Sequence, residues 1–240
     1  METIKTIINK SEFQFKEKSS LFIGYLFPIQ NLNEVESILS EIRKKHYDAT
    51  HNCYAYKFID KESFKYSDDG EPNGTAGIRI LNAINHYNLS NVLVISTRYF
   101  GGTKLGVGPL GKAYYNSAIG AIENAEIVTK KKYSKILICF GYENISNVHH
   151  FITTYKVQNI SNLFNQTPQI ECLIKPEFIQ NLNENLLAIS NGKIEIKILE
   201  ENIYLWISVS IDAKSQLSLS NKMFFIGLDR LYFKVVSPFT

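Results

Sequence analysis

The chain has 240 residues, 45% of them hydrophobic, and a formal net charge of +3. This length exceeds the usual size of one domain and the apolar content is enough for packed cores, so extensive disorder is excluded and one large or two small domains are expected. The near balance of acidic and basic side chains argues against a broad basic surface for duplex DNA, although a local anion site remains compatible with it.

Three widely spaced cysteines, Cys53, Cys139 and Cys172, are too few and too scattered for a disulfide framework or a structural zinc site. The N-terminal residues lack the apolar centre of a signal peptide, and no apolar stretch is long enough to span a bilayer. We therefore expect a soluble, cytoplasmic protein with reduced thiols and no membrane association.

The first half of the chain predicts alternating strands and helices. Residues 3–29 alternate and are rich in aromatic and β-branched side chains, which predicts a strand pair with its turn near 16–20. Residues 32–45 have the apolar spacing of an amphipathic helix that Asn31 or Asn33 can cap. The elements expected next are a strand at 51–59, a short strand at 64–67, a helix at 75–87, a buried strand at 92–97, a glycine-rich loop at 98–108, and a helix with Pro109 at its first position that ends near 124.

The second half changes character near Glu126. The expected elements are strands at 133–141, 157–164, 169–174 and 193–199, with helices at 145–155 and 176–190. This is the βαββαβ order of a ferredoxin-like domain. Residues 201–240 do not fit that unit and contain one further expected strand at 204–211. The predicted organisation is a domain at 1–127, a second domain at 131–200 and an extension at 201–240.

The loop at 98–108 is the strongest candidate for a binding site. A buried strand leads into a loop that holds four glycines, two cationic side chains and a threonine, and a helix follows at once. Glycines let main-chain amides approach a ligand closely, and a helix N-terminus favours negative charge. The predicted anion or nucleic-acid site comprises Arg98, Gly101, Gly102, Thr103, Lys104, Gly106 and Gly108. The alternative is a tight loop that only packs under its neighbouring aromatic side chains.

Two earlier segments supply further candidates for the same site, namely His51, Cys53, Asp68, Asp69, Glu71 and Thr75. The acidic residues could hold Mg²⁺ or Ca²⁺, although acidic side chains before a helix are ordinary turn and cap residues. A Cys–His pair on one strand could form a thiolate nucleophile, although a packed cysteine beside a hydrogen-bonded histidine is more common. We predict no metal and no cofactor.

The three segments together resemble the Impact/YigZ family. The matching stretches are residues 48–56, 67–77 and 97–106, and the resemblance covers about residues 15–125. It implies a first domain with the ribosomal protein S5 domain 2-like fold and a ferredoxin-like second domain, an α+β arrangement similar to consecutive domains of elongation factor G. The extension after Leu199 departs from the bacterial members.

Eukaryotic members of this family regulate translation initiation and carry an added N-terminal RWD domain, which this chain is expected to lack. The resemblance therefore implies a factor that binds RNA, the ribosome or a translation factor, and it implies no established enzymatic activity. Two alternatives remain open, a divalent-metal-dependent phosphoester or nucleotide-handling enzyme and a protein-interaction adaptor. The oligomeric state cannot be predicted from the sequence.

Overall fold

The computed structural model describes residues 3–59, 63–164 and 167–206, and within these ranges the chain is a mixed α+β protein with two five-stranded sheets. The predicted α+β class is thereby confirmed, whereas the two fold types named for the domains stay predictions. In the described part of the chain, no helix has the length and apolar character needed to span a bilayer.

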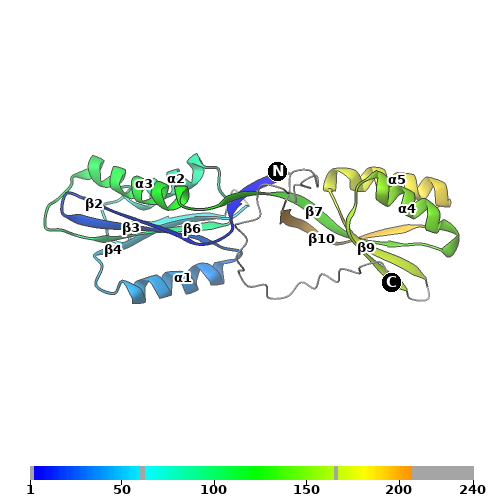
Figure 1. The fold of residues 1–240 in the computed structure, drawn as a ribbon, viewed down its shortest axis with the longest axis horizontal. Coiled ribbons are helices and arrows are strands. Elements are labelled where there is room, and N and C mark those ends of the chain that lie inside the picture. The colour runs from blue at the N-terminus through cyan, green and yellow to red at the C-terminus, as the bar shows by residue number, and fades with distance from the viewer. Residues whose placement is uncertain (1–2, 60–62, 165–166, 207–240) are drawn as a thin grey trace, which may run out of the picture. The chain divides into compact units, whose positions relative to one another are not determined.

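The first sheet has the strand order β2-β3-β6-β4-β5, and every neighbouring pair is antiparallel. Helices α2 and α3 cover one face of this sheet and α1 covers the other (Figure 1). The strands are β2 (Ser11–Glu17), β3 (Ser20–Pro28), β6 (Val92–Tyr99), β4 (His51–Lys57) and β5 (Phe64–Ser67), and the helices are α1 (Leu32–Lys45), α2 (Gly77–His86) and α3 (Val107–Glu123).

Strand β6 is buried because it lies in the middle of this sheet. Seven of its eight side chains are buried, because helices pack on both faces and strands pair along both edges. The amphipathic helix α1 buries Val35, Leu39 and Ile42 against the sheet, and the Asn31 side chain accepts a hydrogen bond from the Glu34 amide at 3.0 Å. Of the two expected caps, the structure uses Asn31, which satisfies one of the free amides at the helix start.

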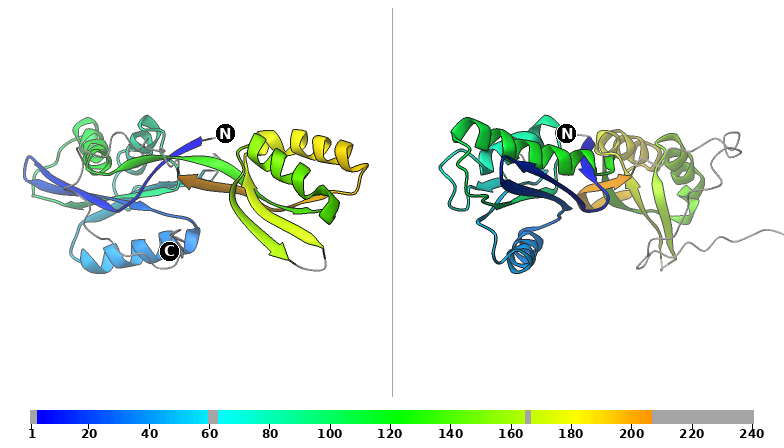
Figure 2. Two further views of the ribbon diagram at one scale, coloured as in Figure 1. Left: turned by 45° about the vertical axis from the view of Figure 1, so that its right-hand side comes forward. Right: turned by 60° about the vertical axis from the view of Figure 1, so that its left-hand side comes forward.

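The second sheet has the strand order β10-β7-β9-β8, and β1 pairs with the first part of β7. Helices α4 and α5 pack over one face of this sheet (Figure 2), where they bury an aliphatic core around Ile136, Ile138 and Leu182. The strands are β1 (Thr3–Ile7), β7 (Ile127–Cys139), β8 (Gln158–Phe164), β9 (Pro168–Ile174) and β10 (Glu195–Trp206), and a short 3₁₀ turn at Tyr142–Asn144 precedes α4 (Ile145–Thr154) and α5 (Pro176–Ser190).

Four predicted elements differ most from the structure. Residues 3–29 form three strands, because β1 pairs with β7 across more than a hundred residues and only β2 and β3 form the expected hairpin. Strand β7 begins at Ile127, since its first residues pair with β1. Helix α3 begins at Val107, which places Pro109 two residues further into the first turn. Strand β10 continues to Trp206 through register shifts, where two separate strands were expected. Residues 207–211 of the second expected strand lie outside the described residues.

Candidate functional site

A cavity of about 430 Å³ lies where the three candidate segments meet. Segment 48–56 contributes His51, segment 67–77 contributes Glu71, and the glycine-rich loop contributes Lys104 and Gly106. We call this cavity the loop pocket, and its lining residues are Thr50, His51, Glu71, Pro72, Arg98, Phe100, Lys104, Leu105, Gly106, Val107 and Leu110. The lining therefore combines polar and cationic side chains with apolar ones.

A buried ion pair forms the floor of the loop pocket. The Arg98 Nη1 group donates to the Glu71 Oε1 atom at 2.6 Å, and the two side chains are only 6% and 4% exposed. Tyr114 donates its hydroxyl to the same oxygen at 2.7 Å, and burial raises the pKa of this tyrosine above its usual value, which keeps it a donor. The sequence predicts that Arg98 contacts an external anion, but this pairing makes its Nη1 group part of the scaffold.

One nitrogen of the Arg98 guanidinium has no hydrogen-bond partner among the described residues. Its Nη2 group donates to the Ser20 hydroxyl at 3.3 Å, while its buried Nε has no hydrogen-bond partner in the described part of the chain. The rings of Phe22 and Phe100 lie 5.5 Å and 5.3 Å from the guanidinium carbon. Because a buried N–H normally has a partner, the free Nε marks a place where an acceptor would be favourable.

His51 stands at the polar edge of the loop pocket in a defined orientation. Its Nδ1 lies 2.8 Å from the main-chain carbonyl oxygen of Asp69, and because a carbonyl only accepts, Nδ1 carries the proton. The other ring nitrogen, Nε2, faces Glu71 Oε1 at 3.8 Å. His51 therefore lines the loop pocket in a fixed orientation, and in this tautomer its Nε2 is an acceptor.

The glycines of the loop are required for different reasons. A Cβ atom at Gly101 would overlap the carbonyl group of Ser19 in the turn between β2 and β3. Gly102 and Gly106 have φ angles of 84° and 86°, in the left-handed region that favours glycine, and open space surrounds both. The loop is therefore held against the hairpin at one point and is exposed beyond it.

The exposed part of the loop offers free main-chain donors. The amides of Phe100 and Gly101 donate to the hydroxyls of Thr50 and Ser20, whereas the amides of residues 102–107 donate to no acceptor in the described ranges. Gly106 is the N-cap of α3 and supplies no side-chain oxygen, and the first turn of this helix carries no acidic side chain. This end of α3 therefore lacks the internal anion that often satisfies a helix N-terminus.

Two acidic residues of segment 67–77 organise its backbone. The two oxygens of Asp68 accept hydrogen bonds from the amides of Gly74, Ala76 and Gly77, which caps the start of α2. Asp69 accepts from the Asn52 amide and pairs with an arginine of α1. Among the described residues, no three His, Cys, Asp or Glu side chains gather closely enough to hold a metal ion, so the metal-dependent alternative has no support.

Cys53 and Thr75 are also structural. The Cys53 thiol is fully buried and donates to the carbonyl oxygen of Asp68 at 2.9 Å, and burial raises its pKa far above the ordinary value. A thiolate nucleophile needs the opposite shift, so the burial of Cys53 gives no support to the Cys–His alternative. The Thr75 hydroxyl donates to the Pro72 carbonyl at 2.6 Å and is likewise buried.

Five of the predicted site residues line the loop pocket: His51, Glu71, Arg98, Lys104 and Gly106. The other predicted residues shape the surrounding backbone or lie on the exposed loop: Cys53, Asp68, Asp69, Thr75, Gly101, Gly102, Thr103 and Gly108. Sequence reasoning missed the apolar wall made by Pro72, Phe100, Leu105, Val107 and Leu110. Their signal in the sequence was the apolar side chains interspersed among the glycines.

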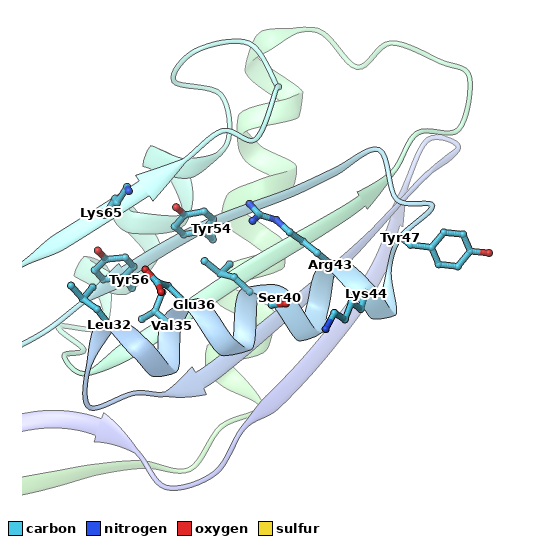
Figure 3. A pocket seen from close by; sticks show the side chains of 11 residues that line it. Leu32, Val35, Glu36, Ser40, Arg43, Lys44, Tyr47, Tyr54, Tyr56 and Lys65 are labelled. Atoms are coloured by element: carbon cyan, nitrogen blue, oxygen red, sulfur yellow. The ribbon is translucent and has the colours of Figure 1, made fainter.

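A second, larger hollow of about 570 Å³ lies between α1, β4 and β5 (Figure 3). The labelled tyrosines of β4 lie along it, whereas Tyr47 at the end of α1 points away from the other labelled residues. It is lined by Leu32, Val35, Glu36, Leu39, Ser40, Arg43, Lys44, Tyr47, Tyr54, Tyr56 and Lys65. Because none of the predicted site residues lines it, we keep the loop pocket as the candidate site.

Comparison with known proteins relates the chain to one family. The Impact N-terminal domain model matches residues 18–122, a range that includes all three segments. An IMPACT family member of Haemophilus influenzae is 30% identical over 81% of this chain and 97% of its own length, and YvyE of Bacillus subtilis is 28% identical over 80% and 89%. The human protein named Protein IMPACT is 38% identical, but over only 38% of this chain and 29% of its own length.

A solved structure described as that of a hypothetical protein superposes with a TM-score of 0.59 at 22% identity, over 84% of this chain and all of its own. At this identity the likeness concerns the fold alone. The sequence matches go further, because the Haemophilus relative is aligned over nearly its whole length and the family model spans the residues that build the loop pocket. The chain belongs to the IMPACT family.

Proposed function

We propose that this protein is a cytoplasmic, non-enzymatic factor that binds RNA on the ribosome or elsewhere in the translation machinery and takes part in the regulation of translation. The observation that carries the proposal is the free main-chain amides of residues 102–107 beside Lys104 and the start of α3. Main-chain donors, a cationic side chain and an uncapped helix N-terminus are the means by which proteins hold phosphate groups.

The proposal includes an assignment of the two folds. The first domain, residues 1–127, is of the ribosomal protein S5 domain 2-like type, and the second, residues 131–200, is ferredoxin-like. The strand order β10-β7-β9-β8 with two helices on one face supports the second assignment, because it is the order that a ferredoxin-like βαββαβ unit adopts. The role of residues 201–240 is left open, although β10 extends into this range as far as Trp206.

The test is binding of single-stranded RNA, and co-sedimentation with ribosomes, at about 50 and 200 mM salt. We expect affinity to fall steeply with salt, because binding of phosphates releases condensed cations. Lys104→Ala is expected to weaken binding several-fold. It should also reduce the slope of log affinity against log salt concentration by about 1, the amount that corresponds to one phosphate contact.

The matched control is Lys112→Ala, which removes an equal charge from an exposed position of α3 outside the loop pocket. It should bind nearly as well as the natural chain. Salt-independent binding, or equal losses in the two variants, would contradict the proposed site. Association with ribosomes that survives nuclease treatment would favour the adaptor alternative instead.

A further inference from the structure

The lining of the loop pocket contains two kinds of side chain, and one ligand should account for both. Lys104 and His51 are polar and lie close to the start of α3 in the lining, whereas Phe100, Leu105 and Val107 are apolar. A phosphate group alone would leave the apolar side chains without a contact. A volume of about 430 Å³ falls within the range typical of small-ligand sites, which runs from about 300 to 1,000 Å³.

The side chain of Phe100 is suited to contact a flat ligand. It is 44% exposed, which is high for a phenylalanine, and the Arg98 guanidinium lies 5.3 Å from its ring centre. A ring held in this way keeps its orientation while part of its surface stays open to the cavity. Exposed aromatic rings beside a cationic side chain are the platforms on which unpaired bases stack.

The second independent observation is the unpartnered donor on Arg98. The side chain is 6% exposed, it lines the loop pocket, and its Nε has no hydrogen-bond partner among the described residues. The uncapped start of α3 and this buried donor belong to different elements. Arg98 and the start of α3 both border the loop pocket, and the exposed ring of Phe100 borders it too, which favours a ligand that has both an anionic group and an apolar ring.

We propose, resting on the function proposed above, that the loop pocket receives one nucleotide of an unpaired RNA strand. Its phosphate lies at the free amides of residues 102–107 and Lys104, and its base lies against Phe100. This arrangement excludes a duplex. A paired base is covered by its stacked neighbours and cannot enter a cavity that receives a single nucleotide.

The experiment measures the anisotropy of a labelled octamer of adenosine RNA, with three competitors. These are the same octamer with abasic units, a duplex of equal phosphate number, and adenosine monophosphate. We expect the octamer to bind roughly tenfold more tightly than the abasic strand or the duplex, because stacking of one base on an aromatic ring supplies about that factor. Adenosine monophosphate should compete only at higher concentration, since it lacks neighbouring phosphates.

The variants separate the base from the phosphate. Phe100→Ala should lose about tenfold in affinity for the octamer and little for the abasic strand, and Phe100→Trp should restore binding. Phe64→Ala, which removes a 48% exposed ring from β5 outside the loop pocket, is the control and should bind normally. A circular dichroism spectrum of each variant checks that it is folded.

The outcomes distinguish the two proposals. Equal binding of the normal and abasic octamers, or no effect of Phe100→Ala, would overturn the nucleotide pocket while the RNA-binding function stands. If adenosine monophosphate competes at concentrations as low as those at which the octamer binds, the proposal that the occupant is part of an RNA strand is wrong. Failure of every RNA probe to bind would overturn both the nucleotide pocket and the proposed function.

Discussion

At the scale of single residues, the pairing of Arg98 with Glu71 decides how the loop pocket is built. Both side chains are almost completely buried, and their shared oxygen also accepts from Tyr114. Removal of one partner from a buried ion pair leaves the other charge without compensation, which costs far more than the loss of an exposed pair. The pair therefore stabilises the position of the pocket floor.

We predict that Glu71→Ala lowers the free energy of unfolding by about 3–5 kcal/mol, because Arg98 is left as an isolated buried cation. Urea denaturation measures this loss. The double variant Glu71→Ala/Arg98→Met should recover most of it, since the charge is then absent. Lys197→Ala, which breaks an exposed pair with Glu195, should change stability by less than about 0.5 kcal/mol. Equal losses in the single and double variants would show that the charge is not the cause.

A second prediction at this scale concerns His46, which is buried and lies within hydrogen-bond distance of the hydroxyls of Tyr25 and Tyr99. Burial lowers the pKa of His46 below its ordinary value of 6.5, and the Lys45 ammonium adds to the effect, while Glu12 and Asp48 oppose it. Between the two pKa values the unfolded chain binds more protons than the folded chain. The free energy of unfolding should therefore fall as the pH drops below about 6.5, until His46 protonates in the folded state.

Urea denaturation between pH 7.5 and 5 measures this slope. His46→Gln should reduce it, whereas His150→Gln, at an exposed position of α4, should leave it unchanged. A slope that persists in His46→Gln would assign the pH dependence to other groups.

At the scale of elements, the contact between the loop and the β2–β3 hairpin predicts opposite effects of two glycine substitutions. Gly101→Ala places a methyl group on the carbonyl of Ser19, so it should cost about 1–3 kcal/mol in unfolding free energy. Gly108→Ala meets no atom within 4 Å and lies in the first turn of α3, so it should be neutral or stabilise by up to about 1 kcal/mol. Thermal denaturation of both variants makes the comparison, and a neutral Gly101→Ala would contradict the close approach.

Local signals were enough to predict several elements. The helices at 32–45 and 176–190 and the strand at 64–67 have the predicted bounds, because their sequence signals lie within the element or next to it, such as Asn31 before α1 and Pro176 at the start of α5. Strand β1 was misassigned since its partner β7 lies more than a hundred residues away, and alternation alone does not reveal a partner. The same reason explains the missed start of β7.

At the scale of the whole molecule, three segments separated in the sequence meet at one cavity. The sequence identified the segments through their unusual residue types, but it could not tell a ligand contact from an internal one. Arg98 and Glu71 lie 27 positions apart, and nothing in this spacing distinguishes them from other pairs of charged residues. They nevertheless form the most buried ion pair of the described chain. The apolar wall was missed because Leu105 and Leu110 have the same signature as ordinary core residues.

The most direct test of the central claim is an amide chemical-shift titration of the ¹⁵N-labelled protein with single-stranded RNA at low salt. If the free amides beside Lys104 hold a phosphate, the signals of residues 102–107 should shift most, and the shifts should disappear at high salt. The claim is contradicted if the amide signals of residues 102–107 do not shift while the largest shifts occur elsewhere, for example around Arg43 and Tyr56 in the hollow beside α1.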